Sequence, residues 1–407
     1  MPHRRGPVSA GLALILGTGL LAGCGKAQAP ASTSTPTPAP SPSATARATA
    51  SASPSAELLY AVLESHTKST SGFVPFDTVA IAGLDGYARA RTTFTPLTAP
   101  YVGCLGPLFA PQAHTAAGQA FFIDGKGVVR SLGVDKSVTT VATFSIGTQQ
   151  EASFAVSPDG KHLLGTILTL PPRASSGDPC SAAGTGFAPG NWSEDVYAAD
   201  AGASARSISH RTWPQSQPEN ILSLVGWDAL GPLATFPSSY GTQGGGPIRE
   251  GWYGNVVRVD PTSGTITRPL GTNDCFVGDV SADGHYVCAE SDGIHVFNPD
   301  GTADWKFATP TNEGLALPLL APDLQRVEAL GPAVLGRDGS NLPIGHPRNG
   351  GTVSAGFYCT GWLDNQTLIG LTPVSGTDQV AVVHLSAPSQ IVNLGFRGTF
   401  VGVVTPS

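Results

Sequence analysis

The stretch that decides the fold reads Phe154-Ala155-Val156-Ser157-Pro158-Asp159-Gly160-Lys161-His162-Leu163-Leu164. Two short apolar runs flank a turn in which an Asp side chain bonds its own backbone and a Gly supplies a positive φ. The segment therefore predicts a β-hairpin.

This hairpin has copies along the chain, and a second kind of hairpin alternates with it. Further copies of the first kind are predicted at Gly278–Val287, Leu320–Val327, Gly361–Ile369, Val225–Asp228 and Leu108–Pro111. The second kind has Asp or Gly at its tip and is predicted at Val79–Gly86, Phe121–Gly125, Val196–Gly202, Val257–Gly264, Val296–Gly301, Val334–Gly339 and Val382–Ser386. Two hairpins make the four strands of a propeller blade, and uninterrupted copies recur at about the 40-residue spacing of blades.

The two kinds of hairpin do not match in number, and the chain ends supply the difference. Leu58–Leu63 would be the second strand of the incomplete blade and Thr399–Val404 its first. Pairing these segments closes the ring and leaves no free sheet edge. We therefore expect an all-β fold, a single β-propeller over residues 57–407 with seven blades; six and eight blades are the alternatives.

One turn motif carries a family resemblance. Ser157-Pro158-Asp159-Gly160-Lys161 resembles the WD40-like repeats of TolB-type propellers, although only one or two copies match the motif closely. The resemblance covers residues 58–407 as architecture and implies no particular ligand.

The N-terminus has the three parts of a secretory signal peptide, predicted over residues 1–23. Basic residues precede an apolar run at Gly11–Leu21, which is shorter than the roughly 20 residues that a membrane-spanning helix needs. Leu21-Ala22-Gly23-Cys24 then resembles the bacterial lipobox. The resemblance implies cleavage before Cys24 and lipid on its thiol, which would anchor the protein to the cell membrane outside the cytoplasm, at the cell surface or in the periplasm.

Residues 24–56 are predicted to be a disordered linker behind the lipidated cysteine. Residues 27–56 contain only Ala, Pro, Ser, Thr, Gln and one Arg. Such a stretch cannot bury enough apolar surface to offset its ordering entropy. The formal net charge of −7 also argues against a nucleic-acid partner.

Five cysteines remain besides Cys24, so at least one of them has no partner within the chain. Cys275 and Cys288 flank one predicted turn nearly symmetrically and are predicted to form a disulfide. Cys104 and Cys180 come from neighbouring blades and are a second candidate pair, which would leave Cys359 over. The cysteines form no Cys-x-x-Cys motif and have no histidine cluster beside them in the sequence, so no metal site is predicted.

Two long insertions join the second and third strands of adjacent blades, on the expected ligand face. They run roughly over residues 171–195 and 237–254. Long loops in compact domains are often functional, and Trp, Tyr and Arg are enriched in binding hot spots. The predicted binding residues are Trp192, Tyr240, Arg249, Trp252 and Tyr253. The alternative is neutral lengthening of loops, which costs little.

The sequence contains no recognisable catalytic motif. A Gly-x-Ser-x-Gly elbow, a His-Glu-x-x-His motif and a phosphate-binding loop are all missing. We therefore predict no catalytic residues, no cofactor and a non-enzymatic binding or scaffold module for a protein or glycan. The alternatives are a propeller enzyme that acts on an extracellular polysaccharide through carboxylates in its channel, and a structural envelope protein without a specific ligand.

Overall fold

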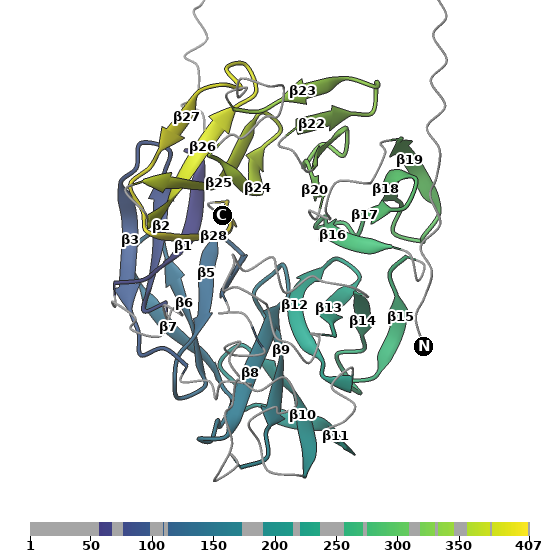
Figure 1. The fold of residues 1–407 in the computed structure, drawn as a ribbon. Coiled ribbons are helices and arrows are strands. Elements are labelled where there is room, and N and C mark those ends of the chain that lie inside the picture. Colours follow the sequence, from purple (N-terminus) through teal and green to yellow (C-terminus); the bar gives the residue numbers. More distant parts are fainter. Residues whose placement is uncertain are drawn as a thin grey trace, which may run out of the picture. The chain divides into compact units, whose positions relative to one another are not determined.

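The computed structural model describes residues 57–66, 76–97, 109, 113–172, 190–214, 220–236, 256–271, 275–308, 318–329, 333–345, 356–374 and 377–405. These residues form seven four-stranded antiparallel sheets arranged in a ring (Figure 1). The predicted all-β, seven-bladed propeller is thereby confirmed. Among the described residues, no helix is long and apolar enough to cross a membrane.

Each blade is one sheet, numbered here in chain order. Blade 1 contains β28 (Gly398–Val404), β1 (Leu59–Glu64), β2 (Thr78–Gly83) and β3 (Ala88–Thr93). Blade 2 contains β4 (Ala113–Ala116), β5 (Gln119–Ile123), β6 (Val128–Gly133) and β7 (Val138–Thr143). Blade 3 contains β8 (Gln150–Val156), β9 (His162–Thr169), β10 (Asn191–Asp200) and β11 (Arg206–Pro214). Blade 4 contains β12 (Ser223–Asp228), β13 (Gly231–Thr235), β14 (Val257–Val259) and β15 (Ile266–Pro269).

The remaining three blades follow the same strand order. Blade 5 contains β16 (Phe276–Val280), β17 (Tyr286–Glu290), β18 (Gly293–Phe297) and β19 (Ala303–Phe307). Blade 6 contains β20 (Leu319–Leu320), β21 (Arg326–Ala329), β22 (Ala333–Gly336) and β23 (Asn341–Pro343). Blade 7 contains β24 (Tyr358–Asp364), β25 (Thr367–Val374), β26 (Thr377–His384) and β27 (Ile391–Asn393).

The ring closes as predicted, through pairing of the two chain ends in blade 1. Strand β28 runs antiparallel to β1, with Leu59 opposite Val404 and Glu64 opposite Gly398. A β-carbon at Gly398 would collide with the carbonyl oxygen of Leu63, so glycine allows the two backbones to approach. The C-terminal strand is therefore the innermost strand of the first blade.

The turn chemistry quoted above explains the first hairpins. In blade 3, the hydroxyl of Ser157 donates to Asp159 Oδ1 at 2.6 Å, and Gly160 has a φ of 72°. In blade 5, Ser281 donates to Asp283 Oδ1 at 2.5 Å, and Gly284 has a φ of 95°. The same side-chain bond and left-handed glycine therefore close both turns.

Blade 2 is the one whose hairpins the sequence misplaced. Phe109 lies before the first strand, and the turn between β4 and β5 is Ala117–Gly118, with Ala117 at a positive φ of 46°. The predicted second hairpin at Phe121–Gly125 is wrong because the turn at residues 124–127 joins β5 to β6, the second strand to the third. An Asp-Gly turn signal marks a chain reversal but does not say which strands it joins.

The innermost strands of neighbouring blades are linked by side chains that bond the backbone. His114 Nε2 donates to the carbonyl of Phe154 at 2.7 Å, which joins blade 2 to blade 3. Burial lowers the pKa of His114 to about 4, so the imidazole is neutral at pH 7. Ser153 Oγ accepts the N–H of Leu224 at 2.8 Å, between blades 3 and 4. These bonds satisfy buried polar groups at the blade boundaries.

Candidate functional site

Two long connections leave adjacent blades on the same face of the ring. They join β9 to β10 in blade 3 and β13 to β14 in blade 4. Leu164 and Val196 of blade 3 share a core cluster with Ala234 and Val257 of blade 4. We call this side, where second strands end and third strands begin, the connection face. Residues 173–189 and 237–255, with the predicted binding residues Tyr240, Arg249, Trp252 and Tyr253, lie outside the described residues.

Trp192 does not lie in a loop, contrary to prediction. It is the second residue of β10, it is fully buried, and it stands opposite Trp213 of β11. Leu168 and Leu170 pack in the same cluster. The predicted loop boundary at residue 195 was wrong because the polar residues around Trp192 hide a strand with alternating burial. Trp192 therefore anchors the end of the connection and is not an exposed contact.

A buried carboxylate lies two residues further along β10. Glu194 is fully buried and accepts a hydrogen bond from the Arg211 guanidinium of β11. The N–H of Leu222 donates to it as well, at 3.2 Å from Oε1. Burial raises the pKa of Glu194 from its ordinary value of 4.5 to about 7, although the charge of Arg211 opposes the shift. Glu194 thus ties β10 both to β11 and to the segment that enters blade 4.

The raised pKa of Glu194 makes stability depend on pH. Between pH 4.5 and about 7, folded Glu194 holds a proton that the unfolded chain has released. The free energy of unfolding therefore falls as pH rises through this window, by up to about 3 kcal/mol. We expect Glu194→Gln to remove much of this slope, measured as the difference between urea unfolding at pH 5 and at pH 8. Asp378→Asn, at an exposed carboxylate, is the control. An unchanged slope in the Gln variant would show that Glu194 is not responsible.

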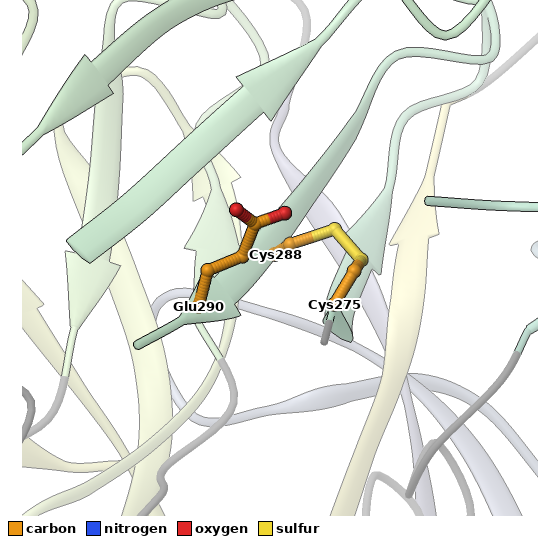
Figure 2. A group of neighbouring side chains, drawn as sticks. All are labelled: Cys275, Cys288 and Glu290. Atoms are coloured by element: carbon orange, nitrogen blue, oxygen red, sulfur yellow. A yellow bond between two sulfur atoms is a disulfide. The ribbon is translucent and has the colours of Figure 1, made fainter. Parts of the chain in front are cut away.

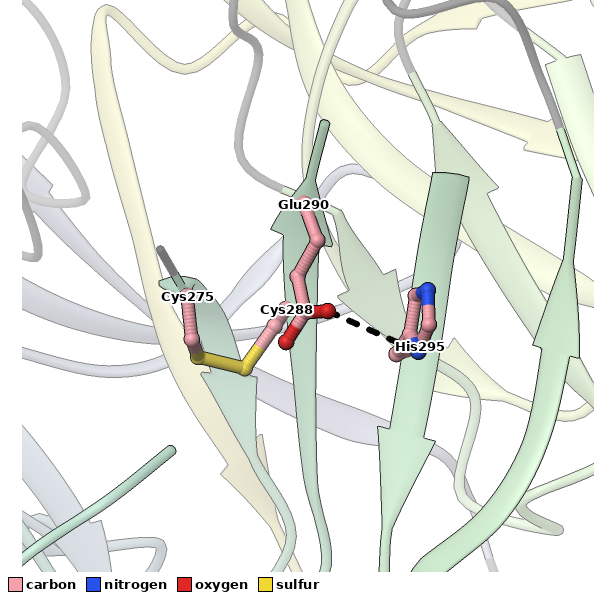
Figure 3. The surroundings of a disulfide bond; sticks show 4 residues. All are labelled: Cys275, Cys288, Glu290 and His295. Atoms are coloured by element: carbon pink, nitrogen blue, oxygen red, sulfur yellow. Dashed lines mark ion pairs between the residues drawn. A yellow bond between two sulfur atoms is a disulfide. The ribbon is translucent and has the colours of Figure 1, made fainter. Parts of the chain in front are cut away.

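A carboxylate–histidine cluster lies at the connection face of blade 5. Glu290 ends β17, Asp292 lies in the two-residue turn that follows, and His295 points toward Glu290 from β18 (Figure 3). His295 Nε2 lies 2.7 Å from Asp292 Oδ1, and His295 Nδ1 lies 3.7 Å from Glu290 Oε2. Lys306 of β19 bonds the other oxygen of Asp292 at 3.2 Å. Hydrogen bonds from His295 and Lys306 lower the pKa of Asp292, which keeps the carboxylate ionised at neutral pH.

The predicted disulfide lies beside this cluster. Cys275 and Cys288 are bonded, with their Cα atoms 5.2 Å apart, and the carboxylate of Glu290 lies close to the bridge (Figure 2). Both cysteines are buried, so the bridge is a structural one. Cys24, Cys104 and Cys180 lie outside the described residues, and Cys359 is half-buried on β24, with Sγ 3.5 Å from the carbonyl oxygen of Gly361.

Sequence reasoning missed the cluster because its members meet only across a hairpin. Glu290 pairs with Gly293, so the tight turn brings a histidine on the third strand back beside a carboxylate on the second. The available signal was Glu-x-Asp followed by a histidine three residues later, over a predicted two-residue turn. Using that signal requires the exact residues at which the strands end, and strand ends are the least certain part of a sequence-based assignment.

Blade 1 carries a related arrangement on its connection face. Glu64 at the end of β1 is buried and pairs with Arg91 of β3 at 2.8 Å. His66 Nδ1 lies 3.0 Å from Asp77 Oδ1, and its Nε2 lies 3.5 Å from Glu64 Oε2. Burial raises the pKa of Glu64, with Arg91 opposing the shift. In blades 1, 3 and 5, a basic side chain of the outermost strand thus pairs with a carboxylate nearer the ring centre.

Comparisons with known proteins place the chain by fold alone. No model of a known protein family matches the sequence, and no curated protein does. An oligogalacturonate lyase in complex with manganese is similar at a TM-score of 0.46 and 8% identity, over 82% of this chain and 90% of that one. TolB from Acinetobacter baumannii is similar at a TM-score of 0.37 and 13% identity, over 84% of this chain and 65% of that one. A functionally unknown protein from Desulfotomaculum acetoxidans is similar at a TM-score of 0.43 and 13% identity, over 86% of this chain and 100% of that one.

Proposed function

We propose that the protein is a lipid-anchored binding or scaffold module that works outside the cytoplasm and presents the connection face to a protein or glycan. The observation that carries this proposal is the adjacency of the strand ends in blades 3 and 4. Because β9 and β13 end on neighbouring blades, two long connections start and return on the same part of one face. These connections contain Tyr240, Arg249 and Trp252, which belong to residue types enriched in hot spots.

The disulfide supports the proposed compartment. Stable disulfides form in oxidising compartments and are rare in the cytosol. A buried Cys275–Cys288 bridge is therefore consistent with export through the signal sequence. Lipid on Cys24 would then keep the propeller at a membrane surface, with the linker as a spacer.

The pairing of the buried carboxylates favours binding over catalysis. Glu64 and Glu194 have raised pKa values, the usual mark of a candidate general acid. Each, however, accepts a hydrogen bond from an arginine of its own blade, Arg91 or Arg211. Such pairs fit side chains that hold strands together better than groups kept ready for proton transfer.

The test replaces the two connections in living cells. We would exchange residues 173–189 and 237–255 for short Gly-Ser linkers, singly and together, and crosslink the protein in intact cells. Partners captured by the wild type should be lost from the double replacement, while its thermal unfolding stays close to that of the wild type. Retention of every partner would mean that the connection face is not the binding surface. A Cys24→Ser variant is the anchoring control, because without lipid the protein should leave the membrane fraction.

A further inference from the structure

The tautomer of His295 follows from its hydrogen bond to Asp292. The carboxylate of Asp292 can only accept, and it lies 2.7 Å from Nε2, so Nε2 carries the hydrogen. The ammonium of Lys306 holds the same carboxylate from its other side, at 3.2 Å. In the neutral imidazole, Nδ1 therefore presents its lone pair, and the nearest carboxylate on that side is Glu290.

Two basic atoms thus face each other across a gap. Glu290 Oε2 and His295 Nδ1 are 3.7 Å apart, which is too far for a direct hydrogen bond. A Zn²⁺ ion binds imidazole nitrogen and carboxylate oxygen at about 2.0–2.2 Å, so a 3.7 Å separation corresponds to an angle of about 120° at the ion. The gap therefore has the width that two ligands of a single small cation require.

We propose that Glu290 and His295 form a two-ligand binding site for a first-row divalent cation such as Zn²⁺ at the connection face of blade 5. Asp292 is the outer carboxylate that orients the imidazole, as in the carboxylate–histidine–zinc arrangement of many metal sites. Imidazole with carboxylate suits Zn²⁺ and its neighbours, whereas Mg²⁺ prefers oxygen ligands alone. The proposal does not depend on the proposed binding function.

The surroundings leave positions for further ligands. The side chains of Glu290 and His295 are 17% and 13% exposed, so water, or a donor group of a bound partner, can complete the coordination. The sulfurs of Cys275 and Cys288 lie close by but are joined, so neither is a thiolate. The ligand set is therefore one nitrogen and one oxygen, without sulfur.

The occupant that competes with a metal ion is a proton. A doubly protonated His295 would carry a positive charge and form ion pairs with both Glu290 and Asp292. That arrangement has no requirement for metal, so it predicts that removing His295 leaves Zn²⁺ binding unaffected. The two alternatives are therefore separated by titration with Zn²⁺ alone.

The experiment uses the full chain in detergent, without a histidine tag, stripped with EDTA, and with the Cys275–Cys288 bridge verified by thiol titration. Zn²⁺ is titrated calorimetrically into the wild type, Glu290→Gln, His295→Ala and His295→Gln. The matched control is His285→Ala, because His285 also pairs with a carboxylate, Asp283, but at the opposite end of blade 5. Circular dichroism and thermal unfolding without metal verify that each variant is folded.

We expect the wild type to bind one Zn²⁺ per chain. The affinity for Zn²⁺ should fall at least tenfold in Glu290→Gln and in both His295 variants, and it should be unchanged in His285→Ala. Zn²⁺ should also raise the wild-type unfolding temperature, since binding to the folded state stabilises it. Asp292→Asn should weaken binding about tenfold, at the lower end for loss of an outer partner. Zn²⁺ binding that is absent from the wild type, or equal in the wild type and the folded His295 variants, would overturn the proposal.

Discussion

Deletion of residues 398–407 should abolish cooperative folding of the propeller. The deletion removes β28, the innermost strand of blade 1, and leaves the fully buried strand β1 with an unpaired edge. It also removes Val404, Val401 and Phe400 from the cores on either side of blade 1. Val404 is fully buried, and burial of a side chain of this size contributes about 1.5–3 kcal/mol. Val401 and Phe400 are partly buried and contribute less each, but their loss adds to the loss of the whole β28–β1 pairing. The combined loss is large against the roughly 5–15 kcal/mol that a typical domain has in total.

Urea unfolding followed by circular dichroism, together with resistance to a protease, measures this effect. Deletion of residues 406–407 alone is the control, because β28 ends at Val404. A synthetic peptide of residues 397–407, added in excess, should partly restore protease resistance if the missing strand is the cause. A truncated chain that unfolds at the wild-type urea concentration would show that ring closure contributes little to stability.

Ring closure is also the part of the fold that the sequence predicted best. The two kinds of hairpin differed by one in number, and Thr399–Val404 was the one apolar segment at the C-terminal end that could pair with Leu58–Leu63. The structure has this pairing, with only the strand boundaries adjusted. Counting hairpins reveals a missing strand because every blade requires four strands.

Details within blades were harder to predict, for a different reason. The Asp-Gly turn at residues 124–127 and the buried Trp192 were both misassigned because turn signals and residue types carry no information on which strand is second or third. The cluster at Glu290 and His295 depended on the same register. The turn and hydrophobic patterns were thus sufficient to predict the architecture. Predicting which side chains meet across adjacent strands would have required the exact first and last residue of each strand.

The buried ion pair of blade 4 is a further feature that the sequence did not indicate. Asp228 at the end of β12 accepts two hydrogen bonds from Arg258 of β14, both at 2.6 Å, and a third from the N–H of Leu230 at 2.7 Å. The Asp228 and Arg258 side chains are 3% and 7% exposed, so both charges depend on each other. A lone buried charge costs far more than the pair, because the desolvation of the remaining partner is no longer offset.

Asp228→Ala and Arg258→Met should therefore each lower the free energy of unfolding by about 3–5 kcal/mol, whereas a double variant Asp228→Leu/Arg258→Met should lose less than either. The matched control is the Asp304–Arg337 pair, which has the same two-bond geometry at 2.8 and 3.0 Å but a more exposed arginine, 43% against 7%. Because solvent screens that pair, Asp304→Ala should cost no more than about 1 kcal/mol.

The measurement for both pairs is urea unfolding at pH 7. Equal losses at the two sites would mean that burial does not determine the strength of this pair. A double variant as unstable as the sum of the single changes would mean that the two charges act independently. The two arginine–carboxylate bonds and the residue types are matched, so a difference between Arg258→Met and Arg337→Met is attributable to solvent access, whereas Asp228→Ala also removes the bond from Leu230.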